Sequence, residues 1–399
     1  MKTKQRLTTC FNAGALLFVA VAARADIPPL LPAPAPQQVI VQLSATDQWL
    51  SAFNRSNRVD AAADSAASAD EVSLEDIRAL LQRARETGDQ RLLGQALHFL
   101  NQMPTPTTES HLLRATALQA LHRFDPALDE LQFVLQREPG NAQAWLLQAT
   151  LHSVRGDYAA AQKACGKLLG KVPALLSGSC SSSVQARQGQ AQRAYALLAQ
   201  LYEQTARALN DPAILHHAQV SLADIADQLG NPAAVHWWAL AQQSRPGDLY
   251  TRIGATRNAF HRGAHAEVVA LTENADDIDA LALLRTLSLQ QLGNPAALTL
   301  RQQLVQRLDL ARERGDTLHG RDQAAILLDL LQRPDEALAI AQQNWQEQRE
   351  PEDTALLLRA ALAAQRPDIY RATCDWLQQR NQWHVRYPVQ SNDFPEPLS

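Results

Sequence analysis

The sequence predicts an all-α protein, a right-handed α-solenoid of about nine stacked helical hairpins. Three observations predict this fold: residues 108–141 repeat as residues 142–175 without a gap, Ala, Leu and Gln are abundant, and only 16 of 399 residues are Gly. A fixed period near 34 residues is typical of stacked hairpins, and Ala, Leu and Gln favour helix. Such an array also distributes the 46% hydrophobic residues of a chain too long for one ordinary core.

The first 25 residues are predicted to be a secretory signal peptide. Lys2, Lys4 and Arg6 precede the apolar stretch AGALLFVAVAA, and the small residues Ala23 and Ala25 suit cleavage after Ala25. The alternative is an N-terminal membrane anchor, but the apolar run is shorter than the roughly 20 residues that span a bilayer. We therefore expect a periplasmic or secreted mature chain without a stable membrane span.

The charge of the mature chain also restricts its partners. Cleavage would take the formal charge from −4 to −8, because four basic residues leave with the leader and no acidic residue does. An acidic exported chain is a poor candidate for binding nucleic acid or anionic lipid. We therefore predict no nucleic-acid partner.

Residues 26–72 are predicted to form a Pro-rich and Ala/Ser/Asp-rich linker. The stretch IPPLLPAPAP at 27–36 has Pro at every second or third position and should be an extended spacer. Residues 56–71 contain too few large apolar side chains to pack. Between these stretches, residues 37–53 could form a short strand or a helix, and their periodicity leaves both open.

The matching positions of the two best repeats explain the period. They are Leu112 with Leu146, Ala115 with Ala149, Phe124 with Tyr158, Ala127 with Ala161, Val134 with Leu168, and Pro139 with Pro173. The small Ala residues allow the two helices of a hairpin to approach closely, and the aromatic residue fills the gap beside their turn. Pro ends the second helix because it lacks an N–H group and disfavours helical geometry before it.

The segment AWLLQATLHSVRGDYAAAQKACGKLLGKVP at 144–173 resembles a tetratricopeptide repeat (TPR). The matching residues are Trp145, Ala149, Gly156, Asp157, Tyr158, Ala161 and Pro173. Weaker TPR-like units keep the register at 85–100, 187–201, 226–246, 261–271, 290–300, 332–341 and 364–377. The array is therefore predicted at 73–380, with a C-terminal tail at 381–399, and its register is unclear at 273–279 and 312–322. Ser73 and Asp76 are predicted to form the capping box of the first helix.

Two of the three cysteines that remain after cleavage are predicted to form a disulfide. In the repeat numbering, Cys165 lies in the second helix of one unit and Cys180 in the first helix of the next. These helices are packed neighbours in this architecture, and an exported protein meets oxidising conditions. The alternative is two buried free thiols that pack as small apolar groups. Cys374 is expected to be unpaired and buried.

No catalytic, cofactor-binding or metal-binding residue is identified. His261 and His265 are four positions apart, but Gly263 lies between them at an expected turn, and no carboxylate or Cys completes a ligand set. The sequence contains no phosphate-binding Gly-rich loop, nucleophile elbow or paired-Cys motif. We therefore predict a non-catalytic protein without a cofactor.

The resemblance implies that the first helices line a concave groove that binds a protein or peptide partner. Transferred position by position, it implies groove residues Arg78, Gln82, Arg85, Leu112, Thr116, Leu146, Thr150, Tyr250, Ile253, Arg257 and Phe260. Apolar side chains with Arg at intervals suit an extended peptide of acidic character. At 249–275, the aromatic residues and Arg257 predict the strongest binding region; the alternative is that Phe260 packs against the preceding hairpin and only Arg257 is exposed.

Three function classes follow from this architecture. The first is an exported, non-catalytic scaffold or adaptor that binds another envelope or secreted protein. The second is an accessory component of polysaccharide export or cell-envelope assembly, where similar exported helical arrays occur. The third is an enzyme with a site across the groove, which would need convergent ionisable groups that the sequence does not reveal.

Overall fold

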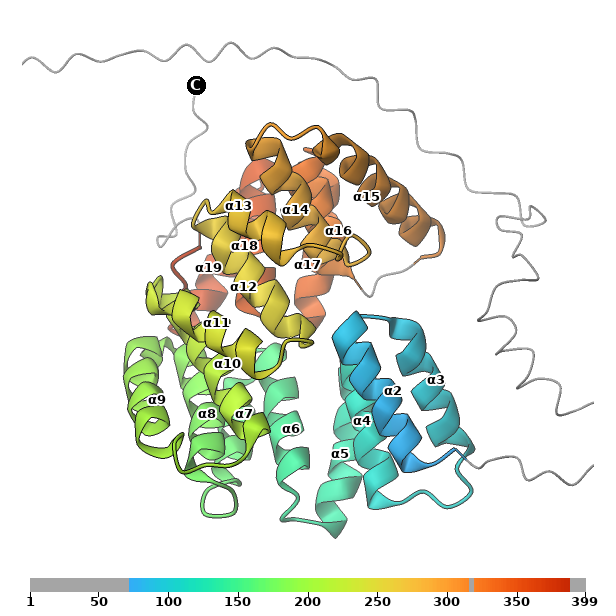
Figure 1. Ribbon diagram of the computed structural model, residues 1–399, viewed down its shortest axis with the longest axis vertical. Helices are drawn as coiled ribbons and strands as arrows, with labels where there is room; N and C mark the ends of the chain where they lie inside the picture. The colour runs from blue at the N-terminus through green and yellow to red at the C-terminus, as the bar shows by residue number, and fades with distance from the viewer. Residues whose placement is uncertain (1–71, 316–318, 388–399) are drawn as a thin grey trace, which may run out of the picture. The chain divides into compact units, whose positions relative to one another are not determined.

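The computed structural model describes residues 72–315 and 319–387, which form the predicted all-α array of hairpins (Figure 1). The predicted signal peptide, the linker up to residue 71 and residues 388–399 of the tail lie outside the described residues. In the part of the chain that is described, no helix is both long enough and apolar enough to span a membrane.

The helices follow one another without intervening strands in the described ranges. They are α2 (Leu74–Thr87), α3 (Gln90–Gln102), α4 (Thr108–Ala120), α5 (Phe124–Arg137), α6 (Ala142–Val154), α7 (Tyr158–Gly166), α8 (Ala174–Gln185), α9 (Ala191–Thr205), α10 (Pro212–Leu229), α11 (Ala233–Ser244), α12 (Leu249–His261), α13 (His265–Leu271), α14 (Asp279–Gln291), α15 (Ala296–Glu313), α16 (Gly320–Ala325), α17 (Pro334–Glu347), α18 (Pro351–Ala363) and α19 (Pro367–Gln379). Two short irregular segments, η2 (Ala186–Gln190) and η3 (Ile326–Leu330), follow α8 and α16.

Paired in order, α2 with α3 up to α18 with α19, the described helices form nine hairpins. The two helices of each hairpin pack against each other, and successive hairpins also pack through their first helices, α2 on α4, α4 on α6 and α6 on α8. The first helices therefore form a continuous wall, and the predicted solenoid of TPR-like hairpins is confirmed.

The repeat positions have the burial that the sequence predicts. Ala115, Ala127 and Ala161 are fully buried where the helices of a hairpin meet. Phe124 and Tyr158, the first residues of α5 and α7, are also buried. Small side chains at the contacts and one aromatic beside each turn thus build the core of these two hairpins.

Each hairpin turn contains one residue in the left-handed backbone region. These residues are Gly88, His122, Gly156, Gly189, Gly230, Gly263, Gly293, Gln332 and Gln365. This region favours Gly because a Cβ atom strains it, so a non-Gly residue such as His122 costs roughly 1 kcal/mol there. The array begins as predicted, with Ser73 and Asp76 forming a capping box at the start of α2.

The two places with unclear register contain hairpins of unusual length. Helix α13, before 273–279, has 7 residues, whereas α15, which runs into 312–322, has 18. These hairpins keep their place in the array because the packing is between neighbours and tolerates units of different length.

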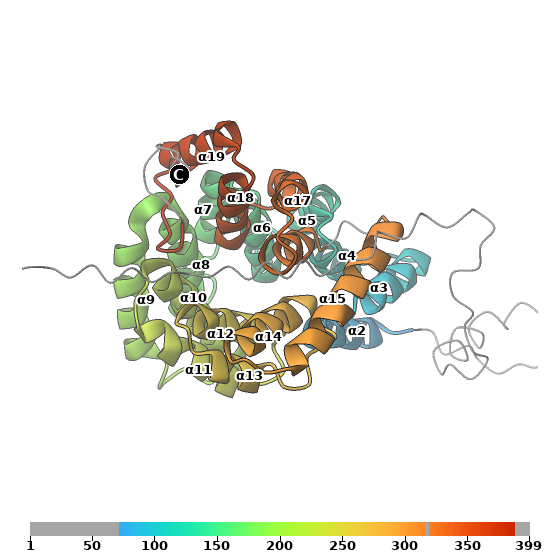
Figure 2. The ribbon, with the colours of Figure 1, turned by 90° about the horizontal axis from the view of Figure 1, so that it is seen from above.

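Residues of the last two hairpins contact the turns of the second and third hairpins. The backbone N–H of Arg349, after α17, donates to the carbonyl oxygen of Val154 at 2.7 Å, and Gln348 hydrogen-bonds to His122 at 2.9 Å. Trp376 of α19 lies against the turn at Gly156. Seen from above, α17 and α19 lie on the side of the array that α5 and α7 occupy (Figure 2). Within the described residues, the array therefore closes on itself.

Residues 381–387, which the sequence assigns to the tail, pack into this closed array. The N–H of Val385 donates to the carbonyl oxygen of Gln228 at 3.0 Å, and the amide of Gln228 donates to the carbonyl oxygen of Trp383 at 2.7 Å. His384 is buried. The folded array thus extends past the last helix, and we refer to residues 381–387 as the strap.

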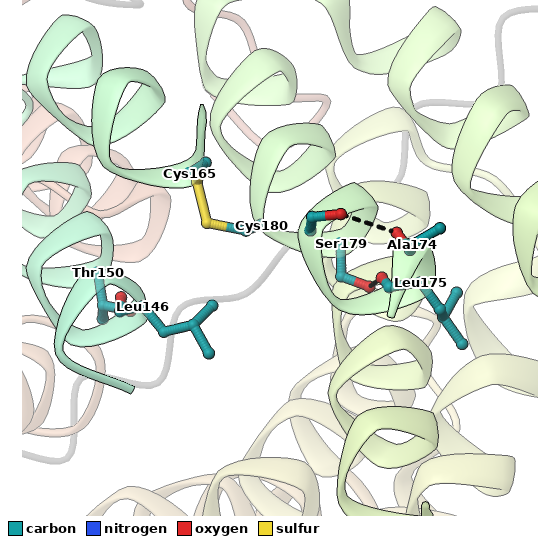
Figure 3. The surroundings of a disulfide bond; sticks show 8 residues. Leu146, Thr150, Cys165, Ala174, Leu175, Ser179 and Cys180 are labelled. Atoms are coloured by element: carbon teal, nitrogen blue, oxygen red, sulfur yellow. Dashed lines mark hydrogen bonds between the residues drawn. A yellow bond between two sulfur atoms is a disulfide. The ribbon is translucent and has the colours of Figure 1, made fainter. Parts of the chain in front are cut away.

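Cys165 of α7 and Cys180 of α8 form a disulfide, with their Cα atoms 5.6 Å apart (Figure 3). Helix α8 is rich in Ser, a weaker helix former than Ala or Leu, and the hydroxyl of Ser179 donates to the carbonyl oxygen of Leu175 at 2.7 Å. The disulfide therefore ties a segment of low helix propensity to the preceding hairpin. Cys374 is free and buried.

Candidate peptide-binding groove

The first helices α2 and α4 form a groove with a cavity of about 310 Å³, which we refer to as the N-terminal groove. Its walls are Arg78, Leu81, Gln82 and Arg85 of α2, Glu109, Leu112, Leu113 and Thr116 of α4, and Gln143 of α6. The structure thus brings together all five groove residues that the sequence implies on these two helices.

The two arginines of the N-terminal groove differ in their partners. Arg78 forms ion pairs with Glu75, at 2.5 Å, and with Glu109. Arg85 is exposed and forms no ion pair with any residue in the described ranges. Because a guanidinium group pairs well with a carboxylate, Arg85 is available to an acidic ligand.

The polar residues Gln82 and Thr116 bond within their own helices. The amide of Gln82 donates to Glu86 at 2.6 Å, and the hydroxyl of Thr116 donates to the carbonyl oxygen of Leu112 at 2.9 Å. These bonds hold the side chains along the helix surface and leave the apolar side chains of α4 facing the cavity.

Leu146 and Thr150 lie on α6, outside the walls of the N-terminal groove. Thr150 is exposed, and its hydroxyl donates to the carbonyl oxygen of Leu146 at 3.1 Å. Leu146 packs against the hydrophobic cluster that contains Ala149 and the disulfide. These two implied groove residues therefore share no cavity wall with those of α2 and α4.

Helix α12 lines two adjoining cavities. Tyr250, Ile253 and Arg257 bound one of about 190 Å³, together with residues of α10, α16, α18 and the strap; we refer to it as the central cavity. Arg257 and Phe260 bound a second cavity of about 120 Å³ beside leucines of α14. All four implied residues of α12 thus lie on cavity walls.

Arg257 is engaged in an ion-pair cluster between these two cavities. Its Nε lies 3.5 Å from Oε2 of Glu352, and Arg386 of the strap pairs with the same carboxylate. Burial alone would raise the pKa of Glu352, but Arg257 and Arg386 hold that pKa well below its usual value. The cluster links α12, α18 and the strap, so Arg257 already has a carboxylate partner within the chain.

The two aromatic side chains of α12 have different surroundings. Tyr250 is 50% exposed, and its hydroxyl donates to Asp224 at 2.9 Å. Burial raises the pKa of Asp224 to about 7, with Arg187 opposing the shift. Phe260 is partly buried and packs edge-on against His265, with ring centroids 5.7 Å apart. Tyr250 is therefore the more accessible of the two aromatic residues.

Most charged residues of the central cavity are not identified by the sequence reasoning. They are Arg187, Asp224, Asp227, Arg321, Asp322, Glu350, Glu352, His384 and Arg386. They come from separate hairpins and the strap, and closure of the array brings them together. One usable signal is the composition of the strap, NQWHVRY, because two aromatic residues beside His and Arg are unusual in a solvated tail.

Comparisons with known proteins leave the chain without an assigned family. No protein-family profile matches it, and no curated protein matches it. Among solved structures, the chain is similar to the TPR domain of P58(IPK), with 15% sequence identity over 77% of this chain and 93% of that chain, and a TM-score of 0.24. The TPR-like assignment therefore rests on the hairpins, turns and packing of this chain itself.

Proposed function

We propose that the chain is an exported, non-catalytic scaffold whose N-terminal groove holds an extended acidic peptide segment of another envelope or secreted protein. The observation that carries this proposal is Arg85, an exposed guanidinium group without an ion pair to any described residue, in one cavity with Leu112 and Thr116. A carboxylate of the peptide would pair with Arg85, while its apolar side chains would contact the leucines of α4.

The charge of the groove and the predicted leader both support this proposal. Arg78 is already paired with Glu75 and Glu109, so the unpaired charge on the groove wall is that of Arg85, which favours an acidic segment. The leader and the Cys165–Cys180 disulfide suit an oxidising compartment outside the cytosol. A partner from the same compartment is therefore expected.

To test this proposal, Gln82 on the groove wall is replaced by a photo-crosslinking amino acid, and the protein is crosslinked in the cells that produce it. Mass spectrometry of the crosslinks should identify an acidic partner segment, which is then synthesised and titrated against the purified mature protein. A matched crosslinker at Gln95, exposed on α3, should not capture that segment.

Substitution of the arginines then tests the role of the groove. R85A is expected to weaken binding of the synthetic peptide by roughly tenfold, since a hydrogen bond to a charged group contributes about 1.5–3 kcal/mol. R83A removes an exposed arginine two positions earlier on α2, outside the groove wall, and should leave binding unchanged. Equal affinities of the two variants would contradict the proposed site.

A further inference from the structure

Four arginines line the central cavity, and three of them have carboxylate partners. Arg257 and Arg386 share Glu352, as described above. Arg321 pairs with Glu350 at 2.8 Å and with Asp353 at 2.6 Å. The fourth arginine, Arg187, takes part in no ion pair with a residue of the described part of the chain.

Arg187 is a partly buried cation with unused donor capacity. Its Nη1 atom is buried and has no hydrogen-bond partner among the described residues. Burial alone would lower the pKa of Arg187, but Glu350 together with Asp224 and two nearby tyrosines more than offsets this effect, so the guanidinium group stays charged. Because an unpaired buried charge is costly, an anion that reached Nη1 would be strongly favoured.

The backbone around Arg187 is held in place by the strap. The amide of Gln228 donates to the carbonyl oxygen of Ala186 at 2.9 Å and to that of Trp383 at 2.7 Å. Gln228 thus joins the residue before Arg187 to α10 and to the strap. Arg187 is therefore presented to the cavity from a fixed position, which is what a preformed binding site requires.

The same cavity also carries carboxylates that would attract a cation. Asp224 accepts a hydrogen bond from Tyr250, and Glu350 lies on the wall with it. The exposed ring of Tyr250 is a further surface for an ammonium group. Five acidic residues and four arginines line the cavity, so its wall presents charges of both signs. A ligand with one negative and one positive group fits this wall.

We propose that the central cavity binds a free α-amino acid, with its carboxylate on Nη1 of Arg187 and its ammonium group between Asp224 and Glu350. A volume of about 190 Å³ admits a small molecule and excludes a folded partner. This site is separate from the N-terminal groove, so the proposal stands whether or not a peptide binds there.

The test is calorimetric titration of the purified mature protein with the standard L-amino acids, one at a time, at constant ionic strength. At least one of them should bind saturably, whereas acetate and methylammonium, which carry only one of the two charged groups, should bind at least about tenfold more weakly. R187Q should lower the affinity at least about tenfold. D224N should also weaken binding, because it removes one of the carboxylates that face the ammonium group.

Controls separate binding from folding. R187Q should remain folded, because the variant breaks no ion pair with a described residue. R193Q, on the exposed surface of α9, should bind the amino acid like the unmodified protein. Saturable binding by none of the amino acids, equal binding by acetate, or binding unaffected by R187Q would each overturn the proposal.

Discussion

The N-terminal groove and the central cavity are built from equivalent first helices, but they differ in what faces them. In the groove, Arg78 has a side chain that is 45% exposed, and Arg85 has no ion-pair partner among the described residues. In the central cavity, Arg257 is 22% exposed and faces Glu352 of α18 and Arg386 of the strap. Arginines on equivalent first helices therefore have different environments.

This difference shows where the repeat picture ends. In an open solenoid each unit contacts only its neighbours, so a repeat position predicts its own surroundings. The repeat position predicts the surroundings of the residues on α2 and α4. It does not predict them on α12, because closure of the array places α18 and the strap against the exposed face of that helix. Four predictions test this comparison, beginning with the largest expected effect.

Removal of the disulfide should have the largest effect and should be confined to the closed part of the array. The double substitution C165A/C180A is expected to lower the free energy of unfolding by about 3 kcal/mol, given a loop of 15 residues. Helix α8, which carries the disulfide, leads directly to Arg187 of the central cavity. Denaturant unfolding measures the loss, and peptide binding to the N-terminal groove should persist. As a control, a reductant should not change the stability of the variant. A decrease in the free energy of unfolding of less than about 1 kcal/mol would contradict this prediction.

Matched glutamate substitutions compare the two regions directly. E352A should cost about 2 kcal/mol, because it leaves Arg257 and Arg386 without their shared carboxylate in a partly buried cluster. E109A, which removes a partner of the exposed Arg78, should change stability by less than about 0.5 kcal/mol. Thermal unfolding distinguishes them, and equal effects would remove the distinction between the regions.

Two turn glycines test the closure itself. A Cβ atom at Gly189 would lie 2.5 Å from the carbonyl oxygen of Asn381 in the strap, whereas one at Gly293 would meet open space. Both residues have positive φ, so G189A and G293A share the backbone strain. G189A should cost about 1 kcal/mol more and should speed proteolysis within residues 381–387. Identical cleavage rates would argue that the strap does not depend on this contact.

The last prediction is a pH dependence from Asp224. Its folded pKa of about 7 lies above the ordinary 3.8, so between these values the folded state holds a proton that the unfolded state lacks. Its contribution to stability therefore falls as pH rises from about 4 to 7 and is constant above that range. Burial causes the shift, Asp227 and Glu350 add to it, and Arg187 and Tyr250 oppose it.

D224N should remove this contribution. The Tm of the variant relative to that of the unmodified protein should rise between pH 5 and pH 8, because only the unmodified protein must ionise a buried carboxyl. Scanning calorimetry across this range measures the difference. A difference that stays constant with pH would show that Asp224 is ionised throughout.

Local features of the fold follow from the sequence. The turn at Gly156, the capping box at Ser73 and the Cys165–Cys180 pair each depend on neighbouring residues or adjacent hairpins, and the structure contains all three. The groove residues of α2 and α4 are implied for the same reason. Short-range packing is thus readable from one sequence.

The central cavity could not be predicted in this way. Arg187, Glu350 and His384 are far apart in the sequence and meet only because small rotations between hairpins add up until the array closes. The sequence of a single repeat does not reveal the total rotation over all hairpins. The strap adds a second difficulty, since its contact with Gln228 depends on where the closed array leaves space.

Closure also affects how this protein can change during evolution. Open repeat arrays lengthen or shorten by duplication or loss of a unit, because each new unit needs only its two neighbours. Here, one extra or missing hairpin between α6 and α17 would shift Arg349 away from Val154 and separate the strap from Gln228. Duplication would therefore disrupt the fold instead of extending it. We expect its diversity to arise by substitution within a fixed number of hairpins.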